Sequence, residues 1–143
     1  MREEISYEYI RGLIEGEGCF SFSPNKTNAT MTPSFAIRMH VRDKKLITMM
    51  RDKLKFKNKV YEYNYPCNDG YKRGPTVTLI VREIGNLKNI IVPLCYKKLI
   101  GNKADSFEKW IDAIGKDPRV TKPYKFIHKL YDDGFYEKIH DFD

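Results

Sequence analysis

The sequence predicts a mixed α+β fold in which two pairs of strands alternate with helices, in the order αββαββα followed by further helical segments. Apolar residues recur at helical spacing near residues 5–17, 44–54, 84–91 and 104–114, and they alternate with polar residues in the segments between the first three of these. A shorter helix is expected near 124–131. No repeat, linker or shift in composition divides the chain, so residues 1–143 are expected to form a single domain.

The first helix, expected from Ile5 to Glu17, carries two apolar stripes instead of one. Projected at 100° per residue, the first stripe consists of Tyr7, Ile10 and Ile14, and the second of Ile5, Tyr9, Gly12, Leu13 and Gly16. A polar stripe, Glu4, Glu8, Arg11 and Glu15, completes the helix surface. One apolar stripe can face the protein's own core, so the second predicts a partner helix, whose backbone could approach closely at the glycines. The simpler interpretation, that Gly16 or Gly18 only ends the helix, stays open but leaves Gly12 unexplained.

The second strand, expected over residues 34–42, separates an apolar face from a basic face. Phe35, Ile37, Met39 and Val41 alternate with Arg38, His40 and Arg42. The first strand separates Phe20 and Phe22 from Ser21 and Ser23, the third places Tyr61, Tyr63 and Tyr65 on one face, and the fourth sets Val77, Leu79 and Val81 against Thr76, Thr78, Ile80 and Arg82. A turn is expected over 67–74, and Asp43 is expected to cap the helix that follows the second strand.

The charge balance favours a polyanionic partner. The chain holds 26 lysines and arginines against 19 acidic residues, a net charge of +7, which favours nucleic acid ahead of a membrane surface. No apolar run reaches the roughly 18 residues of a membrane span, and the acidic N-terminal segment does not resemble a signal peptide. The three cysteines and three histidines form neither a disulfide framework nor a zinc site, and the thiols are expected to be reduced and buried. An intracellular location is expected, in an organelle or in bacterial or phage-infected cytoplasm.

Residues 10–20, IRGLIEGEGCF, closely resemble the LAGLIDADG motif of homing endonucleases, in the form that occurs once per chain. The segment GNKADSFEKW, residues 101–110, is similar to the lysine-bearing segment that precedes the third main helix of that family. The resemblance implies a homodimer in which motif helices pack against each other through Ile5, Tyr9, Gly12, Leu13 and Gly16. It also implies an intron-encoded enzyme. Arg11 stands where the family has a small alanine, and it is expected on the polar stripe.

For the cleavage site, the resemblance implies that Glu17 points from the bottom of its helix toward the scissile phosphates, where most relatives have aspartate. Independently, a carboxylate at a helix C-terminus opposes the helix dipole, and a divalent cation would relieve that penalty. Glu15 and Glu17 point about 200° apart and cannot share one ion. Ligation by Glu17 and the Gly16 carbonyl favours Mg²⁺; Mn²⁺ is expected to substitute, and Ca²⁺ to permit binding without cleavage. The resemblance makes Lys103 and Asp43 the remaining catalytic candidates; the alternative for Lys103 is a solvated lysine at the start of a helix.

The resemblance implies that the four strands form an antiparallel saddle whose polar face lies in the major groove of double-stranded DNA, where a β surface can read base edges. The expected DNA contacts are Ser21, Ser23, Asn25, Lys26, Asn28, Arg38, His40, Arg42, Lys59, Tyr61, Tyr63, Thr76, Thr78 and Arg82. Tyr61 and Tyr63 could instead serve packing. The predicted function is therefore a site-specific, metal-dependent endonuclease that makes double-strand breaks in a long pseudo-palindromic target, with no small-molecule substrate. The alternatives are an intron-splicing maturase, an inactive DNA-binding protein of the same fold, or an unrelated basic RNA-binding domain.

Overall fold

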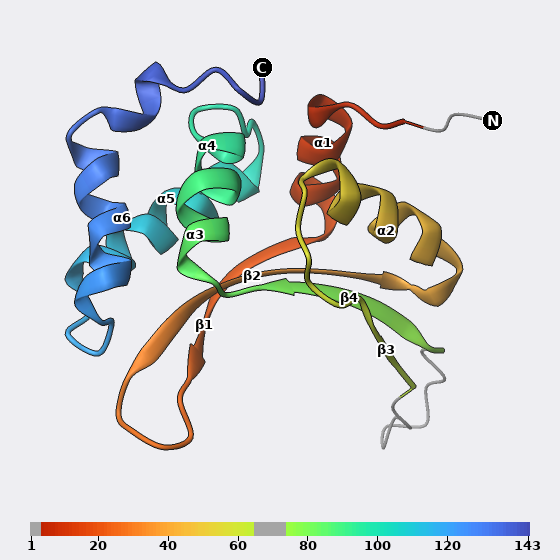
Figure 1. Cartoon of the computed structure of the whole chain (residues 1–143), viewed down its shortest axis with the longest axis horizontal. Coiled ribbons are helices and arrows are strands. Elements are labelled where there is room, and N and C mark those ends of the chain that lie inside the picture. Colours follow the sequence, from red (N-terminus) through yellow and green to blue (C-terminus); the bar gives the residue numbers. More distant parts are fainter. Residues whose placement is uncertain (1–3, 65–73) are drawn as a thin grey trace.

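A four-stranded antiparallel sheet with helices packed on one face forms the framework of the protein (Figure 1). The computed structural model describes residues 4–64 and 74–143. In chain order, the elements up to the last strand are α1 (Tyr7–Glu17), β1 (Gly18–Pro24), β2 (Met31–His40), α2 (Lys44–Lys53), β3 (Tyr61–Tyr63) and β4 (Thr76–Val81). The strand order across the sheet is β1-β2-β4-β3. This arrangement confirms the predicted αββαββα order.

The remaining helices follow β4 and cover the β1 side of the sheet (Figure 1). A continuous helical stretch consists of α3 (Ile84–Asn86), a π-helical turn (Leu87–Ile91) and α4 (Val92–Cys95), so it runs four residues beyond the expected end at Ile91. Two longer helices, α5 (Asn102–Lys116) and α6 (Lys122–Asp132), and a 3₁₀ turn (Phe135–Lys138) complete the chain. Among the residues that the structure describes, no helix has the length and apolar character needed to cross a membrane.

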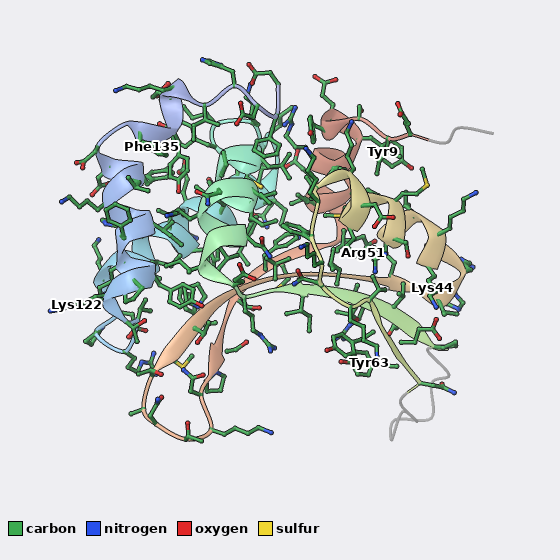
Figure 2. The ribbon with its side chains drawn as sticks, in the orientation of Figure 1. Tyr9, Lys44, Arg51, Tyr63, Lys122 and Phe135 are labelled. Atoms are coloured by element: carbon green, nitrogen blue, oxygen red, sulfur yellow. The ribbon has the colours of Figure 1, made fainter. Side chains whose placement is uncertain are left out.

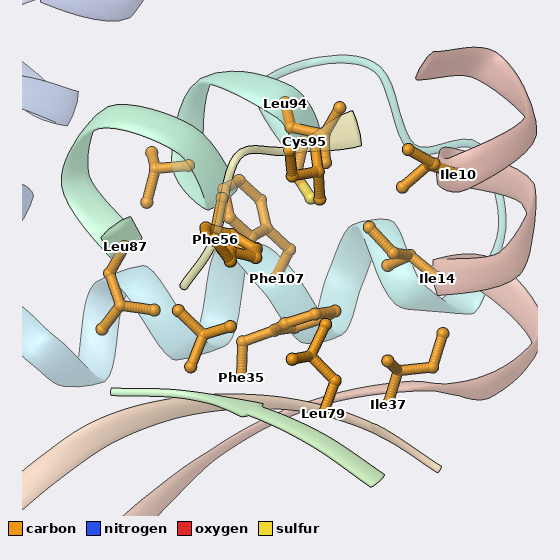
Figure 3. Close-up of a cluster of buried hydrophobic side chains, with 14 of the residues drawn as sticks. Ile10, Ile14, Phe35, Ile37, Phe56, Leu79, Leu87, Leu94, Cys95 and Phe107 are labelled. Atoms are coloured by element: carbon orange, nitrogen blue, oxygen red, sulfur yellow. The ribbon is translucent and has the colours of Figure 1, made fainter. Parts of the chain in front are cut away.

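The core lies between the sheet and the helices, and α1 supplies one wall of it (Figure 3). Ile10 and Ile14 of α1 are fully buried, as are Phe35 and Ile37 of β2 and Leu79 of β4. Burying such a side chain stabilises the fold by roughly 1.5–3 kcal/mol relative to leaving it exposed. The apolar face predicted for each of these elements is therefore the face that packs inward.

Aromatic residues join β1 to α5. The Phe20 ring lies 5.2 Å from Trp110 and 5.3 Å from each of Phe35 and Phe107. The indole Nε1 of Trp110 donates a hydrogen bond of 2.8 Å to the Ser21 carbonyl. Because a buried indole N–H needs an acceptor, this bond fixes the height of α5 over the first strand.

The second strand ends earlier than expected. β2 ends at His40, and Val41–Asp43 form a 3₁₀ turn, so strand alternation no longer applies to Arg42. Asp43 precedes α2 but makes no side-chain capping bond, which corrects the expected cap. Tyr65, Cys67 and the loop predicted over 67–74, apart from Gly74, lie outside the described residues. Cys95 is buried as expected, and this burial raises the pKa of its thiol. Cys19, by contrast, is exposed.

Candidate nucleic-acid interface and cleavage site

One face of α1 is largely uncovered within the described chain, although Leu13 at its border packs against the core. Tyr9 is 42% exposed and projects outward (Figure 2), Leu13 is half-buried, and Gly12 and Gly16 are exposed. A Cβ built at either glycine would meet nothing within 4 Å, apart from the helix's own backbone. Each glycine in a helix interior costs roughly 1 kcal/mol relative to alanine. Gly12 therefore lowers the stability of the folded chain, and no close contact within the described residues requires a glycine there.

Gly18, by contrast, is required by the chain's own fold. A Cβ at Gly18 would lie 2.8 Å from the carbonyl oxygen of Ile14 and 2.9 Å from its Cγ2. Such distances are far below ordinary contact, so only glycine lets the chain leave α1 and enter β1 at this angle. The interpretation that a glycine ends the helix applies to Gly18 and leaves Gly12 and Gly16 for another role.

Two residues that the sequence placed on the first helix lie elsewhere than predicted. Ile5 precedes the helix and is only 6% exposed, because it packs into the core, so it does not extend the exposed face. Arg11 is buried and not on a solvent-facing stripe: its Nη1 donates to the carbonyl oxygens of Leu94 at 3.3 Å and Phe142 at 2.8 Å. The expected polar stripe is therefore wrong at Arg11, since these two carbonyls give the buried guanidinium its partners.

Glu17 is the last residue of α1 and is exposed, at the end of the helix that leads directly into the sheet (Figure 1). The C-terminal end of a helix carries partial negative charge, so a carboxylate there is destabilised unless a cation lies nearby. Within residues 4–64 and 74–143, no three His, Cys, Asp or Glu side chains form a group that could hold a metal ion. The Glu17 carboxylate and the Gly16 carbonyl offer the hard oxygen donors that suit Mg²⁺, and an ion held there would need its remaining ligands from a second chain, from DNA or from water.

Glu15, which the sequence left on a solvated stripe, has a specific partner. Its carboxylate accepts hydrogen bonds from the backbone N–H of Gly101 at 2.8 Å and of Ile100 at 3.2 Å. Gly101 immediately precedes α5, so this contact attaches the start of that helix to the last turn of α1. Sequence spacing could not reveal it, because the bonded residues lie 85 and 86 positions apart.

The two other catalytic candidates differ in their relation to Glu17. Lys103 lies in the first turn of α5, two residues after the Gly101 contact, and is half-buried. Asp43 is displaced from Glu17 along the sheet: Gly18 pairs with Ile37, so the level of Glu17 is that of Arg38, and Asp43 comes five residues later. Two extended and three 3₁₀ residues span roughly 12 Å. None of the contacts in the described chain joins Asp43 to Glu17.

The face of the sheet that carries no helix is concave and presents the predicted DNA-binding residues in rows (Figure 1). One row across β2, β4 and β3 is Arg38, Thr78 and Tyr61, and the next is His40, Thr76 and Tyr63. Arg38 and His40 are exposed, and Ser21 and Ser23 of β1 continue the face on the other side of β2. The rows place basic and hydroxyl groups on one surface.

Thr78 does not lie open on this surface. It is only 1% exposed, and its Oγ1 accepts a 3.4 Å hydrogen bond from Nε of Arg38. The prediction that Thr78 contacts DNA directly is therefore wrong. Thr78 supports Arg38, and the two terminal guanidinium nitrogens of Arg38 are left available on the concave face. Arg42 is exposed in the 3₁₀ turn after β2, so it lies beyond the strand and is not part of either row.

The tyrosines form an aromatic platform at the β3 edge. The rings of Tyr61 and Tyr63 stack at a centroid distance of 6.2 Å and an interplanar angle of 19°, and Lys59 Nζ lies 5.5 Å from the Tyr61 centroid. Figure 2 shows Tyr63 beneath the sheet, on the side away from the helices. A hollow of about 530 Å³ opens here; its lining residues include Lys59, Tyr61, Tyr63 and Arg82. The rings therefore lie on the concave face of the sheet and are not part of the core.

Hydrogen bonds also define the orientation of other predicted contacts. His40 Nδ1 accepts from the Arg42 backbone N–H at 3.1 Å, so a neutral His40 carries its proton on Nε2 and acts as a donor. At the tip of the first hairpin, Asn25 Nδ2 donates to Thr32 Oγ1 at 3.3 Å and Asn28 Oδ1 accepts from the Thr30 N–H at 3.0 Å. Both asparagines thus stabilise the hairpin loop, while Lys26 is exposed between them.

Comparison with known proteins finds solved structures of the same fold. The chain is similar to the LAGLIDADG homing endonuclease I-GzeII in complex with its DNA target (24% identity, TM-score 0.61, over 99% of this chain and 46% of that one). It is also similar to the meganuclease I-SmaMI bound to uncleaveable DNA (19%, 0.63, 99% and 46%) and to the homing endonuclease I-TnaI (22%, 0.60, 94% and 98%).

The chain thus spans less than half the length of the first two structures and nearly the full length of the third. These likenesses show the fold. The model of the LAGLIDADG endonuclease family matches residues 10–114, well over half of the sequence, and includes the motif helix, the sheet and Lys103. This chain belongs to the LAGLIDADG endonuclease family.

Proposed function

We propose that this protein is a homodimeric, site-specific DNA endonuclease that depends on a divalent cation. The observation that carries the proposal is the exposed face of α1, where Gly12 and Gly16 lie open and Glu17 ends the helix beside the concave sheet. Membership of the family and the DNA complexes among the similar structures support a role on DNA.

The concave face supplies the DNA-binding surface. Arg38 and His40 of β2, with Lys59 and Arg82 toward the β3 edge, would neutralise phosphates and read base edges in the major groove. Arg38 is the strongest candidate for a guanine contact, because its Nε is already bonded to Thr78 and its two terminal nitrogens stay free to form a bidentate pair. Each copy would cover about 10 bp, one helical turn.

Glu17 and the Gly16 carbonyl would hold the cation at the bottom of α1. A bound Mg²⁺ would supply an activated water and stabilise the leaving 3′ oxygen. Lys103, held near α1 through the Glu15 contact, would place its ammonium beside the scissile phosphate and so offset the charge that develops there. Glu17 itself would orient its oxygens toward the DNA, since it lies on the exposed end of the helix.

The dimer follows from the number of Glu17 carboxylates that the cleavage of two strands requires. One chain provides one Glu17, whereas cutting both strands requires two such carboxylates related by an axis that coincides with the local dyad of the duplex. Two α1 helices packed through Tyr9, Gly12, Leu13 and Gly16 would bring both Glu17 residues to that axis. The target would then be a long pseudo-palindrome.

The test is cleavage of the uninterrupted host sequence. Wild-type protein is incubated with a plasmid carrying the DNA that flanks its reading frame, joined as it would be without the intron, in Mg²⁺, Mn²⁺ or Ca²⁺. We expect double-strand breaks in Mg²⁺ and Mn²⁺ only, and binding alone in Ca²⁺. Glu17→Gln should reduce the single-turnover rate at least 100-fold while retaining affinity, because it removes charge but little volume.

Two results would contradict the proposal. Glu17→Gln within tenfold of the wild-type rate would remove the metal assignment. Specific binding by the wild type without any cleavage would instead identify an inactive DNA-binding protein, or a maturase if intron RNA were bound as well.

A further inference from the structure

Hydrogen bonds from Glu15 attach the start of α5 to α1. Both carboxylate oxygens lie 3.2 Å from the Ile100 backbone nitrogen, and one of them lies 2.8 Å from that of Gly101. The Ile100 side chain is 90% exposed, and Gly101 and Asn102 are exposed as well, so apolar burial does little to hold this turn of the chain. The position of the helix start therefore depends on hydrogen bonds.

No side chain of α5 or its own flank replaces that support. Gly101 stands at the N-cap position, and none of the residues there makes a side-chain capping bond. The first N–H groups of a helix need acceptors, and the positive end of its dipole favours a carboxylate. Glu15 supplies that charge from another helix.

The same electrostatics bear on Lys103. A cation in the first turn of a helix is disfavoured by the dipole, and α5 carries Lys103 there together with only one acidic residue, Asp105. A carboxylate from α1 that bonds to Gly101 offsets this cost. It also fixes the distance between two helix ends, since Glu17 lies two residues beyond Glu15 and Lys103 two residues beyond Gly101.

We infer that Glu15 is a positioning residue: its carboxylate holds the start of α5 so that Lys103 is kept at the Glu17 end of α1. The inference rests on the proposed nuclease function. It gives the first acidic residue of the segment a role that is separate from metal binding, and it requires that Glu15 act through Lys103.

The experiment combines a mutant cycle with hydrogen exchange. Single-turnover cleavage in Mg²⁺ is measured for wild type, Glu15→Ala, Glu15→Gln, Lys103→Ala and the double variant Glu15→Ala/Lys103→Ala. Asp112→Ala serves as the matched control, because it removes an exposed carboxylate from α5 that pairs only with Lys116 on the surface. Hydrogen exchange of the backbone over residues 99–104 is followed in the same proteins without metal or DNA.

We expect Glu15→Ala to slow cleavage at least tenfold with unchanged affinity in Ca²⁺, and to accelerate exchange at Ile100 and Gly101 at least tenfold. Glu15→Gln, which keeps an acceptor oxygen, should recover the rate to within about threefold of wild type. The double variant should be no slower than Lys103→Ala, because the two residues act as one unit. Asp112→Ala should match the wild type.

Either of two results would overturn the inference, even if hydrogen exchange accelerates. One is a cleavage rate for Glu15→Ala within threefold of wild type. The other is a double variant whose loss of rate equals the product of the two single losses. If Glu15→Ala fails to fold, Glu15→Gln decides: a folded Glu15→Gln that cleaves as slowly as Lys103→Ala would show that the hydrogen-bond acceptor is not what matters. Failure of the wild type to cut any DNA would reject the proposed function itself, and is thereby distinguished from failure of this inference.

Discussion

Replacing Gly12 by alanine should move stability and activity in opposite directions. Gly12 lies in the middle of α1, and a Cβ there meets nothing within 4 Å in the described chain. The substitution therefore gains helix propensity without a steric cost, about 1 kcal/mol for the folded monomer. That gain raises the folding equilibrium constant about fivefold, since 1.4 kcal/mol corresponds to tenfold.

The same methyl group should weaken the dimer. If the backbones of two α1 helices approach at Gly12, each copy adds one methyl group to a surface that has no room for it. Overpacking of this kind typically costs about 1–3 kcal/mol, and the two-fold axis doubles the number of methyl groups. We therefore expect self-association to weaken at least tenfold, and double-strand cleavage at limiting protein to fall with it.

Urea denaturation and analytical ultracentrifugation measure the two effects separately. At concentrations where sedimentation shows monomer, the urea midpoint of Gly12→Ala should rise by about 0.5 M for a slope near 2 kcal/mol per M. Gly115→Ala is the matched control: Gly115 also lies inside a helix, but its Cβ would fall 2.4 Å from the His128 ring, so this variant should not gain stability and should dimerise normally.

A result in which Gly12→Ala raises the midpoint but leaves association and cleavage unchanged would refute the reasoning. It would mean that the open face of α1 is not the contact between copies. A lowered midpoint in the monomer would refute the first half instead, since it would show that the exposed glycine is needed by the chain alone.

Two further predictions concern the monomer. Arg11→Met should lower the free energy of unfolding by about 2–3 kcal/mol, because it leaves the Leu94 and Phe142 carbonyls without their charged donor; the urea midpoint measures this loss. Hydrogen bonds from Arg119 hold the pKa of Asp117 at about 2, below its ordinary 3.8. The ion pair therefore stabilises the fold above that ordinary value, and its contribution disappears as pH falls toward 2. Asp117→Asn should accordingly show a shallower loss of urea midpoint over that acid range than the wild type, and an equal slope would contradict the assignment.

Periodic patterns in the sequence predicted the fold well. Ile10 and Ile14 at helical spacing, and Phe35 with Ile37 at alternate positions, identified the buried faces of α1 and β2, because burial imposes the period of the element on the residue types. The motif likewise located Glu17 at the end of its helix. Such features depend only on residues that are close together in the chain.

The misplaced residues are those whose environment is set by distant segments. Arg11 has a charged side chain, yet carbonyls from α4 and the C-terminal segment, Leu94 and Phe142, allow its burial. Thr78 falls on the polar face but is covered once Arg38 bonds to it from the neighbouring strand. Glu15 belongs to the same class, since no local spacing indicates that Gly101 lies within its reach.

The alternation along β2 separates the residues of the proposed DNA-binding surface from the residues of the core. Arg38 and His40 point to the concave face, whereas Ile37 and Met39, which each precede one of them, point to the core side. Under the proposed function, substitutions at Arg38 and His40 would therefore alter the surface offered to DNA at little thermodynamic cost, and a lineage would move from one target to another through single-codon changes. An insertion or deletion of one codon within the strand has the opposite outcome, because it would exchange the two faces and bury the guanidinium. Evolution toward new targets should thus proceed in this strand by substitution and not by change of length.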